Sequence, residues 1–343
     1  MKVMRRVALY VVMPLAMVLA GGYGWYRLSD TGKGWRYEDK LATYCDGLIP
    51  YKESAVFTGL NTETGLSGDE EGGFGDESVH NCKVADMRLT IALIPDDAVG
   101  SGSDSDDVLD TLRPETATDA LPVALGGGWH GYTNMQDAGV VLACDNKPVS
   151  VVVSIDGDAQ EPPASTARAK GELAASTARK AADRWSCRAE EGGRIPPVPA
   201  PEGESSPYAA SGTCRGIPIP EDQYEIDWLI ETKATGTAPL ENCVLGETGA
   251  RSEPLYWLDA SFGPFAQGLR SATDEPFAVN TDAGLERDSA WATAACPGAA
   301  RAIFRISATV YADPRKGFLT TALRAFAERS AKQHGCTDLK LPD

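Results

Sequence analysis

Eight cysteines are the residues of this chain whose number and spacing most clearly indicate chemistry. They form two sets of four: Cys45, Cys82, Cys144 and Cys187, then Cys214, Cys243, Cys296 and Cys336. Spacings of tens of residues suit disulfides between distant parts of a fold. Zinc ribbons and thioredoxin-type sites need Cys-x-x-Cys pairs, which the sequence lacks. Because cytosolic proteins keep few disulfides, the cysteines predict an oxidising compartment.

The order of the cysteines leaves their pairing open, since each set of four allows three connectivities. We expect the first cysteine of each set to pair with the fourth and the second with the third, so that no bridge joins the two sets. The expected bridges are Cys45–Cys187, Cys82–Cys144, Cys214–Cys336 and Cys243–Cys296. Buried free thiols are the alternative.

Histidines offer little acid–base chemistry here. His80 lies two residues before Cys82, which invites a cysteine–histidine nucleophile, but the matching Cys243 has no neighbouring histidine. Cys82 is therefore predicted to be structural. His334 stands where a helix is expected to end, and capping is the ordinary role of a histidine there.

A glycine-rich loop surrounds the third histidine, with the sequence GGGWHGY over residues 126–132. Such loops can line a pocket or build an oxyanion hole, although no Gly-x-Ser-x-Gly elbow accompanies this one. The second half of the chain carries its own concentration of aromatic residues. We therefore name Trp129, His130, Tyr256 and Trp257 as the possible lining of a ligand groove. The plainer alternative is a surface turn with core aromatics.

Other motifs that bind metals or cofactors are absent from the sequence. Asp104, Asp106 and Asp107 suggest calcium, but the glycine and glutamate of an EF-hand loop are missing, so a solvated acidic loop is expected. The sequence has no P-loop, no dinucleotide-binding glycine motif after a strand and no His-Glu-x-x-His. We predict no catalytic residues, no cofactor and no metal.

The two sets of cysteines belong to two copies of one pattern. Asn81-Cys82 corresponds to Asn242-Cys243, and each copy closes with an Ala-rich helix that ends near its last cysteine. We predict two homologous domains, residues 41–188 and 213–343. The segment 189–212 is rich in Pro, Gly, Ser and Ala, which predicts a flexible linker.

Hydrophobic periodicity gives the elements of each domain. Alternation of apolar and polar residues over 83–94 predicts a half-buried strand. Residues 139–143 and 149–155 predict a hairpin, with 291–295 and 302–310 as its counterpart. The closing helices carry an apolar stripe that needs a sheet to pack on. The fold class is therefore α+β, each domain being an antiparallel sheet covered by a C-terminal helix.

The first residues resemble a membrane anchor. Lys2, Arg5 and Arg6 precede an uncharged run over residues 7–26, whose length as a helix matches a bilayer core of about 30 Å. We predict a cytoplasmic tip and transmembrane helix over 1–27. A stalk over 28–40 follows, with both domains outside the cell, where disulfides form. A signal peptide cleaved after Ala20 is the alternative.

The charge of the chain excludes some partners. Its formal net charge is −17 at pH 7, whereas phosphate backbones require clustered Lys and Arg, so we expect no nucleic-acid partner. Acidity of this kind also disfavours adhesion of the domains to anionic lipid and is typical of a soluble surface.

The Cys45-x-Gly turn, Asn81-Cys82, Cys144 ahead of a strand and the closing helix near Cys187 resemble exported actinobacterial domains of unknown function. Those domains are often lipoproteins with a PsbP-like α+β fold and paired cysteines. The resemblance covers residues 41–188 and 212–341 and implies a cell-envelope location. It supplies no catalytic residues, and this chain lacks a lipid-attachment cysteine after its apolar run.

These features favour a single-pass, membrane-anchored extracellular protein with two tandem domains and a non-catalytic binding role. The expected partner is an envelope protein, a peptide or a small ligand. An envelope enzyme with a carboxylate site and a structural spacer are the alternatives. A paired carboxylate pocket would favour the enzyme, and an exposed apolar patch would favour the binding protein.

Overall fold

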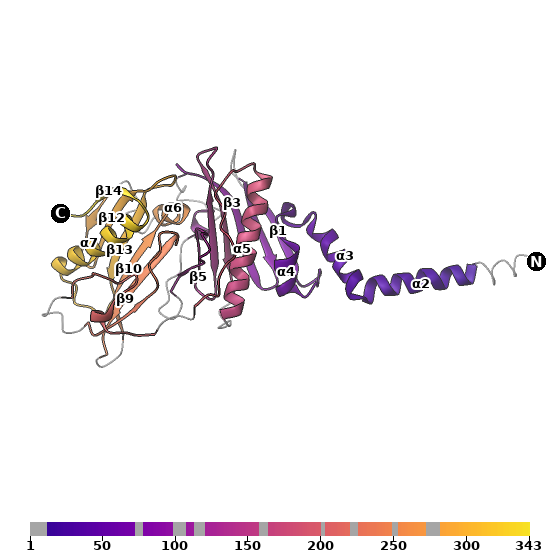
Figure 1. The fold of residues 1–343 in the computed structure, drawn as a ribbon, viewed down its shortest axis with the longest axis horizontal. Coiled ribbons are helices and arrows are strands. Elements are labelled where there is room, and N and C mark those ends of the chain that lie inside the picture. The colour runs from indigo at the N-terminus through magenta and orange to yellow at the C-terminus, as the bar shows by residue number, and fades with distance from the viewer. Residues whose placement is uncertain are drawn as a thin grey trace, which may run out of the picture.

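The protein is described here by a computed structural model that runs from an N-terminal helix through two sheet domains to a C-terminus at the opposite end (Figure 1). The described residues are 12–72, 78–98, 108–112, 121–157, 164–199, 203–219, 226–248, 253–271 and 282–343. The first residues of the expected anchor, up to residue 11, and the acidic segment with Asp104, Asp106 and Asp107 lie outside them.

Two helices precede the first domain: α2 (Met13–Leu28) and α3 (Asp30–Leu41). The stalk expected over residues 28–40 is therefore largely helical. Tyr37 and Leu41 of α3 are buried in the core of the first domain. Within the described part of the chain, no helix combines the length and the apolarity that crossing a membrane requires.

Seven strands form the first sheet in the order β1-β2-β3-β7-β6-β5-β4, and all neighbours are antiparallel. Their bounds are β1 (Leu66–Gly72), β2 (Ser78–Val84), β3 (Met87–Pro95), β4 (Val123–Ala124), β5 (Gly131–Thr133), β6 (Ala138–Ala143) and β7 (Val149–Asp156). The predicted hairpin is confirmed by β6 and β7. The single strand predicted over 83–94 is instead interrupted by a turn in which Ala85 has a positive φ of 53°.

Helices cover one face of this sheet: α4 (Tyr51–Thr58) and α5 (Ala164–Arg184), together with the short η2 (Tyr44–Gly47). Leu89 and Val153 from the sheet share a core cluster with Leu173 from α5. The alternation of apolar side chains along each strand places these residues on the helix side. The predicted C-terminal helix over the sheet is confirmed.

The second domain has the sheet order β8-β9-β10-β13-β12-β11, and β14 adds to the outer edge of β12. The bounds are β8 (Trp228–Glu231), β9 (Leu240–Gly246), β10 (Pro254–Ser261), β11 (Gly284–Leu285), β12 (Ser289–Ala295), β13 (Ala302–Ala308) and β14 (Thr337–Lys340). Helix α7 (Lys316–Gln333) covers one face and buries Phe318, Leu323 and Phe326. Short helices η3 (Asp110–Leu112), η4 (Pro207–Ala209) and α6 (Pro264–Ser271) complete the chain.

The two sheets have equivalent strands. The succession β2-β3-β7-β6 in the first corresponds to β9-β10-β13-β12 in the second, and in both cases a long helix follows the third of these strands. Asn81 and Asn242 occupy matching places on β2 and β9. This common topology supports the duplication inferred from the cysteines.

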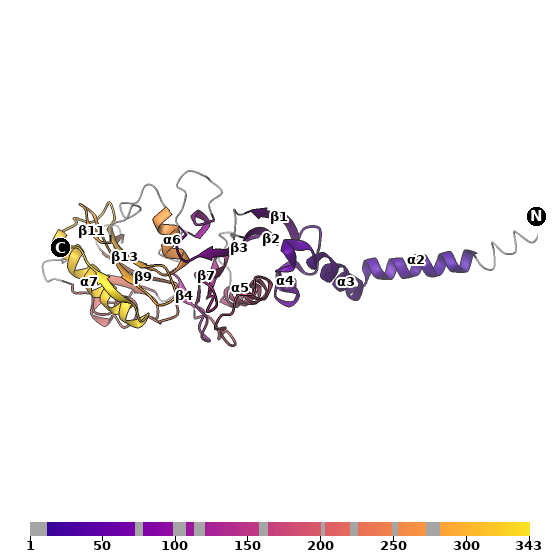
Figure 2. The same cartoon turned by 90° about the horizontal axis from the view of Figure 1, so that it is seen from above.

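Helix α6 separates the two sheets on the faces opposite α5 and α7 (Figures 1 and 2). On one side of α6, Phe265 packs with Ala92 and Val152 of the first sheet. On the other side, Leu269 packs against Ile303 of the second sheet. Gln267 also donates its side-chain N–H groups to the backbone carbonyls of residues 95, 96 and 98, at 2.9–3.1 Å.

This packing corrects the expectation that β3 is half-buried. Thr90, Ala92 and Ile94 face away from α5 and are nevertheless buried, because α6 and its surroundings cover that face. The first sheet is therefore buried on both faces in its centre, and the two domains share an apolar interface.

The segment 189–212 is bonded to both domains over its described residues, rather than free as its composition suggested. Its first part docks on the first domain: Gly193 N–H donates to Gly127 O at 2.7 Å, and Ile195 is buried. Its second part joins the second sheet, where Ser205 and Leu229 exchange backbone hydrogen bonds of 2.9 and 2.8 Å.

All eight cysteines form disulfides, as predicted, but the nested pairing is wrong. The bridges are Cys45–Cys82, Cys144–Cys187, Cys214–Cys243 and Cys296–Cys336. The physical reason lies in the closing helix. Because α5 follows β7 and runs back along the sheet, its C-terminal end returns to the turn before β7, which holds Cys144. In the second domain, α7 follows β13 in the same way, so its C-terminal end brings Cys336 next to Cys296, which lies in the turn before β13.

Replacing both Cys144 and Cys187 with serine is expected to lower the free energy of unfolding by about 2–4 kcal/mol, because the bridge closes a loop of 43 residues. Denaturant titration measures this loss. As a test of connectivity, Cys144→Ser alone should leave Cys187 as the thiol that maleimide labels, identified by peptide mapping. Labelling of Cys82 instead would contradict the pairing.

Candidate functional site

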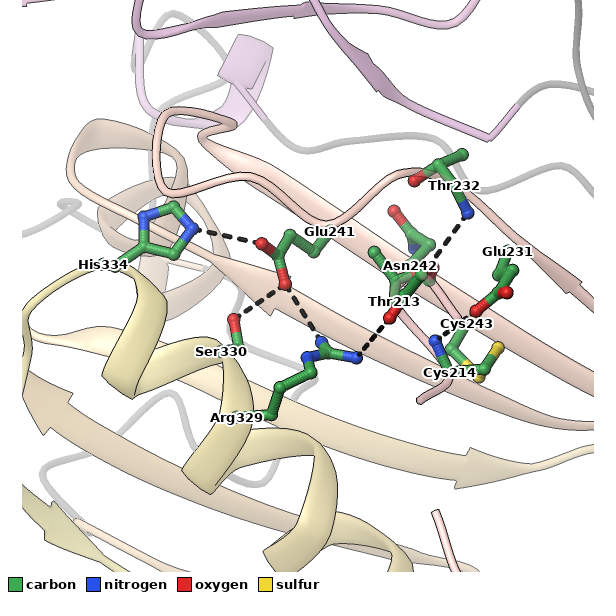
Figure 3. Close-up of polar contacts among 11 residues, drawn as sticks. Thr213, Cys214, Glu231, Thr232, Glu241, Asn242, Cys243, Arg329, Ser330 and His334 are labelled. Atoms are coloured by element: carbon green, nitrogen blue, oxygen red, sulfur yellow. Dashed lines mark hydrogen bonds and ion pairs between the residues drawn. A yellow bond between two sulfur atoms is a disulfide. The ribbon is translucent and has the colours of Figure 1, made fainter. Parts of the chain in front are cut away.

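Buried polar side chains of the second domain gather in a cluster around Glu241 (Figure 3). Glu241 lies on β9 and points toward the C-terminal end of α7, with 1% of its surface exposed. One carboxylate oxygen, Oε2, accepts hydrogen bonds from Arg329 Nη2 at 3.1 Å and Ser330 Oγ at 2.9 Å. The other, Oε1, lies 3.2 Å from His334 Nε2.

The same cluster extends to residues 211–214, the turn through which the chain enters the domain. Arg329 Nη1 donates to the backbone carbonyl of Gly212 at 3.4 Å, and Thr213 Oγ1 donates to Asn242 O at 2.5 Å. Glu231 accepts the backbone N–H groups of Ser211 and Cys214 at 2.8 and 2.9 Å. Burial lowers the pKa of the Arg329 guanidinium, while Glu241 opposes that effect.

A serine, a histidine and a glutamate in contact are also the components of a hydrolase triad, but their order here is different. In a triad the histidine lies between the nucleophile and the carboxylate. Here Glu241 lies in the middle, so that Ser330 donates to the carboxylate and not to His334. Ser330 is fully buried as well. This arrangement fastens α7 to β9 and leaves no nucleophile facing solvent.

A second polar group lies on the opposite face of the same sheet, under α6. Asp259 on β10 accepts hydrogen bonds from Asn242 on β9 and from Arg305 on β13, whose Nη2 lies 3.1 Å from the carboxylate. The cavity beside them has room for about one water molecule. The equivalent place in the first sheet holds the uncharged pair Asn81 and Thr90, 2.9 Å apart.

The four residues predicted to line a ligand groove do not come together. Tyr256 is buried in the core against Phe318, whereas Trp257 points to the other face of β10 and packs near Trp228. Trp129 is buried in the first domain, and His130 beside it is exposed.

The glycine-rich loop holds the chain's own linker. Gly126, Gly127 and Gly128 all have positive φ, between 65° and 83°, which side chains other than glycine rarely adopt. This backbone lets Gly127 O accept the Gly193 N–H, while Trp129 Nε1 donates to Gly193 O at 2.7 Å. The loop therefore serves as a docking site for an internal segment.

The remaining candidates from the sequence are accounted for in the fold. His80 is buried and stacks on Trp185, and Cys82 is bonded to Cys45, which confirms that this cysteine is structural. His334 is the C-cap of α7, as expected, and it also stacks on Phe262 with ring centroids 3.6 Å apart. In the part of the chain that the structure describes, the one cluster with metal-ligating atoms includes Cys45 and Cys82, whose sulfurs bond to each other.

Sequence reasoning missed the buried charged groups, which include Glu241 and Lys170. Lys170 lies on the buried face of α5, where its ammonium donates to Gln136 O at the turn between β5 and β6. Burial lowers the pKa of Lys170, and burial raises the pKa of Asp137 in the same turn. The sequence gives one indication that Lys170 is buried: it lies at helical spacing from Ala167 and Ala174, on the apolar stripe of α5.

His130 is expected to couple the stability of the fold to pH, although part of this residue is exposed to solvent. The surrounding protein lowers the pKa of its imidazole, His334 of the second domain adds to this effect, and Glu190 opposes it. The folded protein therefore takes up a proton less readily than the unfolded chain, so stability is expected to fall as the pH drops below about 6.5. Urea unfolding above and below that pH measures the change. His130→Gln should flatten the dependence; an unchanged slope would contradict this origin.

No protein-family model matches this chain. No curated protein is significantly similar to it, and no solved structure matches it significantly. The resemblance to exported actinobacterial domains therefore stays an expectation.

Proposed function

We propose that this protein is anchored in a cell membrane by its N-terminal segment, that both domains lie outside, and that it binds an envelope partner without catalysing a reaction. The observation that carries the anchor is helix α2. Its large apolar side chains are exposed, with Val18 at 70% and Leu19 at 64%, and the helix extends away from the domains (Figures 1 and 2). A lipid environment would cover this surface.

The four disulfides support an oxidising location for the domains. Charge does not decide this orientation, because Lys2, Arg5 and Arg6 before the uncharged run are matched by basic residues after it: Arg27, Lys33, Arg36 and Lys40. The orientation therefore rests on the disulfides. The buried polar clusters support a role other than catalysis. Most of their hydrogen-bonding groups are directed to one another, and the cavity beside Asp259 has room for about one water.

Membrane fractionation tests the anchor. The full chain, expressed in bacterial cells, is expected to remain in the membrane after alkaline carbonate extraction, and its domains are expected to be digested by protease added to spheroplasts. A variant in which a cleavable signal peptide replaces residues 1–29 should be exported in soluble form. Recovery of a soluble protein that mass analysis shows to begin after Ala20 would contradict a retained anchor.

The binding role is supported by an exposed apolar site in the second domain. Val310 is 91% exposed and Tyr311 is 45% exposed, in the loop between β13 and α7. A photo-crosslinking residue at Val310 is expected to capture one envelope component, whereas the same residue at the exposed Glu328 of α7 should not. Equal capture at both sites would contradict a binding surface at Val310.

A structural spacer is the second candidate, and the packing of the body favours it. Tyr37 and Leu41 of helix α3 are buried in the core of the first domain, and α6 joins that domain to the second. The chain therefore forms a continuous body whose second domain lies far from α2 (Figure 1). A spacer would give no specific crosslink at Val310.

A further inference from the structure

Specific side-chain and backbone contacts fix the connection between α2 and α3, which we call the joint. Ser29 is extended and caps α3 through its hydroxyl, which accepts the Gly32 N–H at 3.0 Å. Gly32 lies against the backbone of Tyr26 so closely that a Cβ atom would overlap Tyr26 O. Glycine at this position therefore permits the two helices to approach each other.

Arg36 completes the joint from the α3 side. Its guanidinium donates to the backbone carbonyls of Tyr26 and Arg27, the latter at 3.0 Å, and lies 5.1 Å from the centre of the Tyr26 ring. These carbonyls belong to the last turn of α2, whose oxygens have no partner within the helix. A cation there satisfies them and complements the negative end of the helix dipole. The end of α2 is thereby suited to a region with little water.

Aromatic side chains surround the joint and face solvent. Trp25 of α2 and Trp35 of α3 meet edge to face with ring centroids 5.6 Å apart, although each remains more than half exposed. Exposed Arg27 is held by Tyr23, whose hydroxyl accepts its Nε–H at 2.9 Å. Tryptophan, tyrosine and arginine side by side are typical of the boundary between acyl chains and lipid headgroups.

The other side of α3 is fixed to the body. Tyr37 is fully buried, its ring lies 5.7 Å from that of Tyr51 on α4, and Leu41 is also buried. The same short helix therefore carries an exposed tryptophan on one side and core residues of the first domain on the other. A surface that binds Trp35 would therefore also fix the orientation of the first domain relative to that surface.

We propose that Trp25, Tyr26, Arg27, Trp35 and Arg36 form an interfacial collar that binds the phospholipid headgroup region. Trp25 and Trp35 lie at the edge of the acyl chains, and Arg27 faces lipid phosphate. The occupant is a bilayer because the collar continues the uncharged run over residues 7–26 and places basic side chains at its end. This inference rests on the proposed anchor and adds to it that α3 holds the body at a fixed angle to the membrane.

Tryptophan quenching by brominated lipids tests the collar in vesicles of equal parts phosphatidylcholine and phosphatidylglycerol. Lipids brominated near the headgroup are expected to quench the full chain more than lipids brominated at the middle of the acyl chain. Trp35→Phe should remove about half of the quenched emission, since two of the seven tryptophans carry it. The matched control Trp257→Phe alters a residue of the second domain and should leave the quenched emission unchanged.

The outcomes separate the two proposals. If the full chain does not float with vesicles, the anchor fails and the collar fails with it. If the chain floats but Trp35→Phe leaves the quenching unchanged, the anchor stands and the collar is overturned. Chemical crosslinking of two copies through this face, without quenching, would show that a second copy of the chain covers it and would also overturn the collar.

Discussion

Replacing Glu241 with glutamine is expected to lower the free energy of unfolding of the second domain by about 3–5 kcal/mol. The buried carboxylate accepts from Arg329 and Ser330 and contacts His334. A neutral amide would leave the Arg329 guanidinium, 9% exposed, without the carboxylate that it is paired with. Denaturant unfolding followed by far-ultraviolet circular dichroism measures the loss.

The control for this prediction is Glu328→Gln. Glu328 lies on the same helix and pairs with Arg324 at 3.8 Å, but both side chains are more than half exposed, so a change below about 1 kcal/mol is expected. The double variant Glu241→Gln, Arg329→Met should be more stable than Glu241→Gln alone, because the second substitution removes the unpaired guanidinium charge. Equal effects of Glu241→Gln and Glu328→Gln would contradict this description of the cluster.

Phe265→Ala is expected to cost about 3–5 kcal/mol and to uncouple the two domains. The ring fills the interface between α6 and the first sheet, where it meets Tyr132 edge to face with centroids 5.5 Å apart. Without it, the Gln267 hydrogen bonds to residues 95, 96 and 98 lose their packing support. A single unfolding transition should separate into two, and small-angle scattering should show a more extended particle.

Phe326→Ala provides the matched comparison. Phe326 is fully buried between α7 and the second sheet, away from the interface, so its loss should destabilise the second domain by a similar amount. The relative position of the domains should then stay as it is in the unmodified chain. If both variants extend the particle equally, Phe265 is not specific to domain coupling.

The repeated cysteine pattern predicted the architecture correctly because it records a covalent constraint. Asn81-Cys82 and Asn242-Cys243 fall on equivalent strands, and the closing helices lie where their apolar stripes required. The pairing was predicted wrongly although its cause was readable. A helix that packs back along the preceding strand must end near the start of that strand, which brings Cys187 to Cys144.

The interface between the domains was missed for a similar reason. The run VSVVVSI over residues 149–155 is nearly continuous in apolar residues, a pattern typical of strands buried on both faces. The pattern predicts a core strand but does not indicate what covers its second face. The occupant of that face, α6, belongs to a different domain, and no local pattern connects Phe265 with Val152.

The clusters around Glu241 and Lys170 were beyond sequence reasoning for a different reason. A single glutamate in a strand or lysine in a helix has no local pattern that distinguishes a buried charge from a solvated one. Only the position of Lys170 on an apolar stripe gave a hint. The partners of Glu241 come from α7, almost ninety positions later in the chain.

The disulfides join cysteines that are consecutive along the chain: the first with the second, the third with the fourth, the fifth with the sixth and the seventh with the eighth. If the chain is exported as proposed, its cysteines emerge from the secretion channel in this same order. An oxidase that joins each newly emerged thiol to the one before it would therefore produce the native set directly. Such a chain can reach its native disulfides without an isomerase. In a nested arrangement, by contrast, the first cysteines would have to stay reduced until their partners near the end of each domain had emerged.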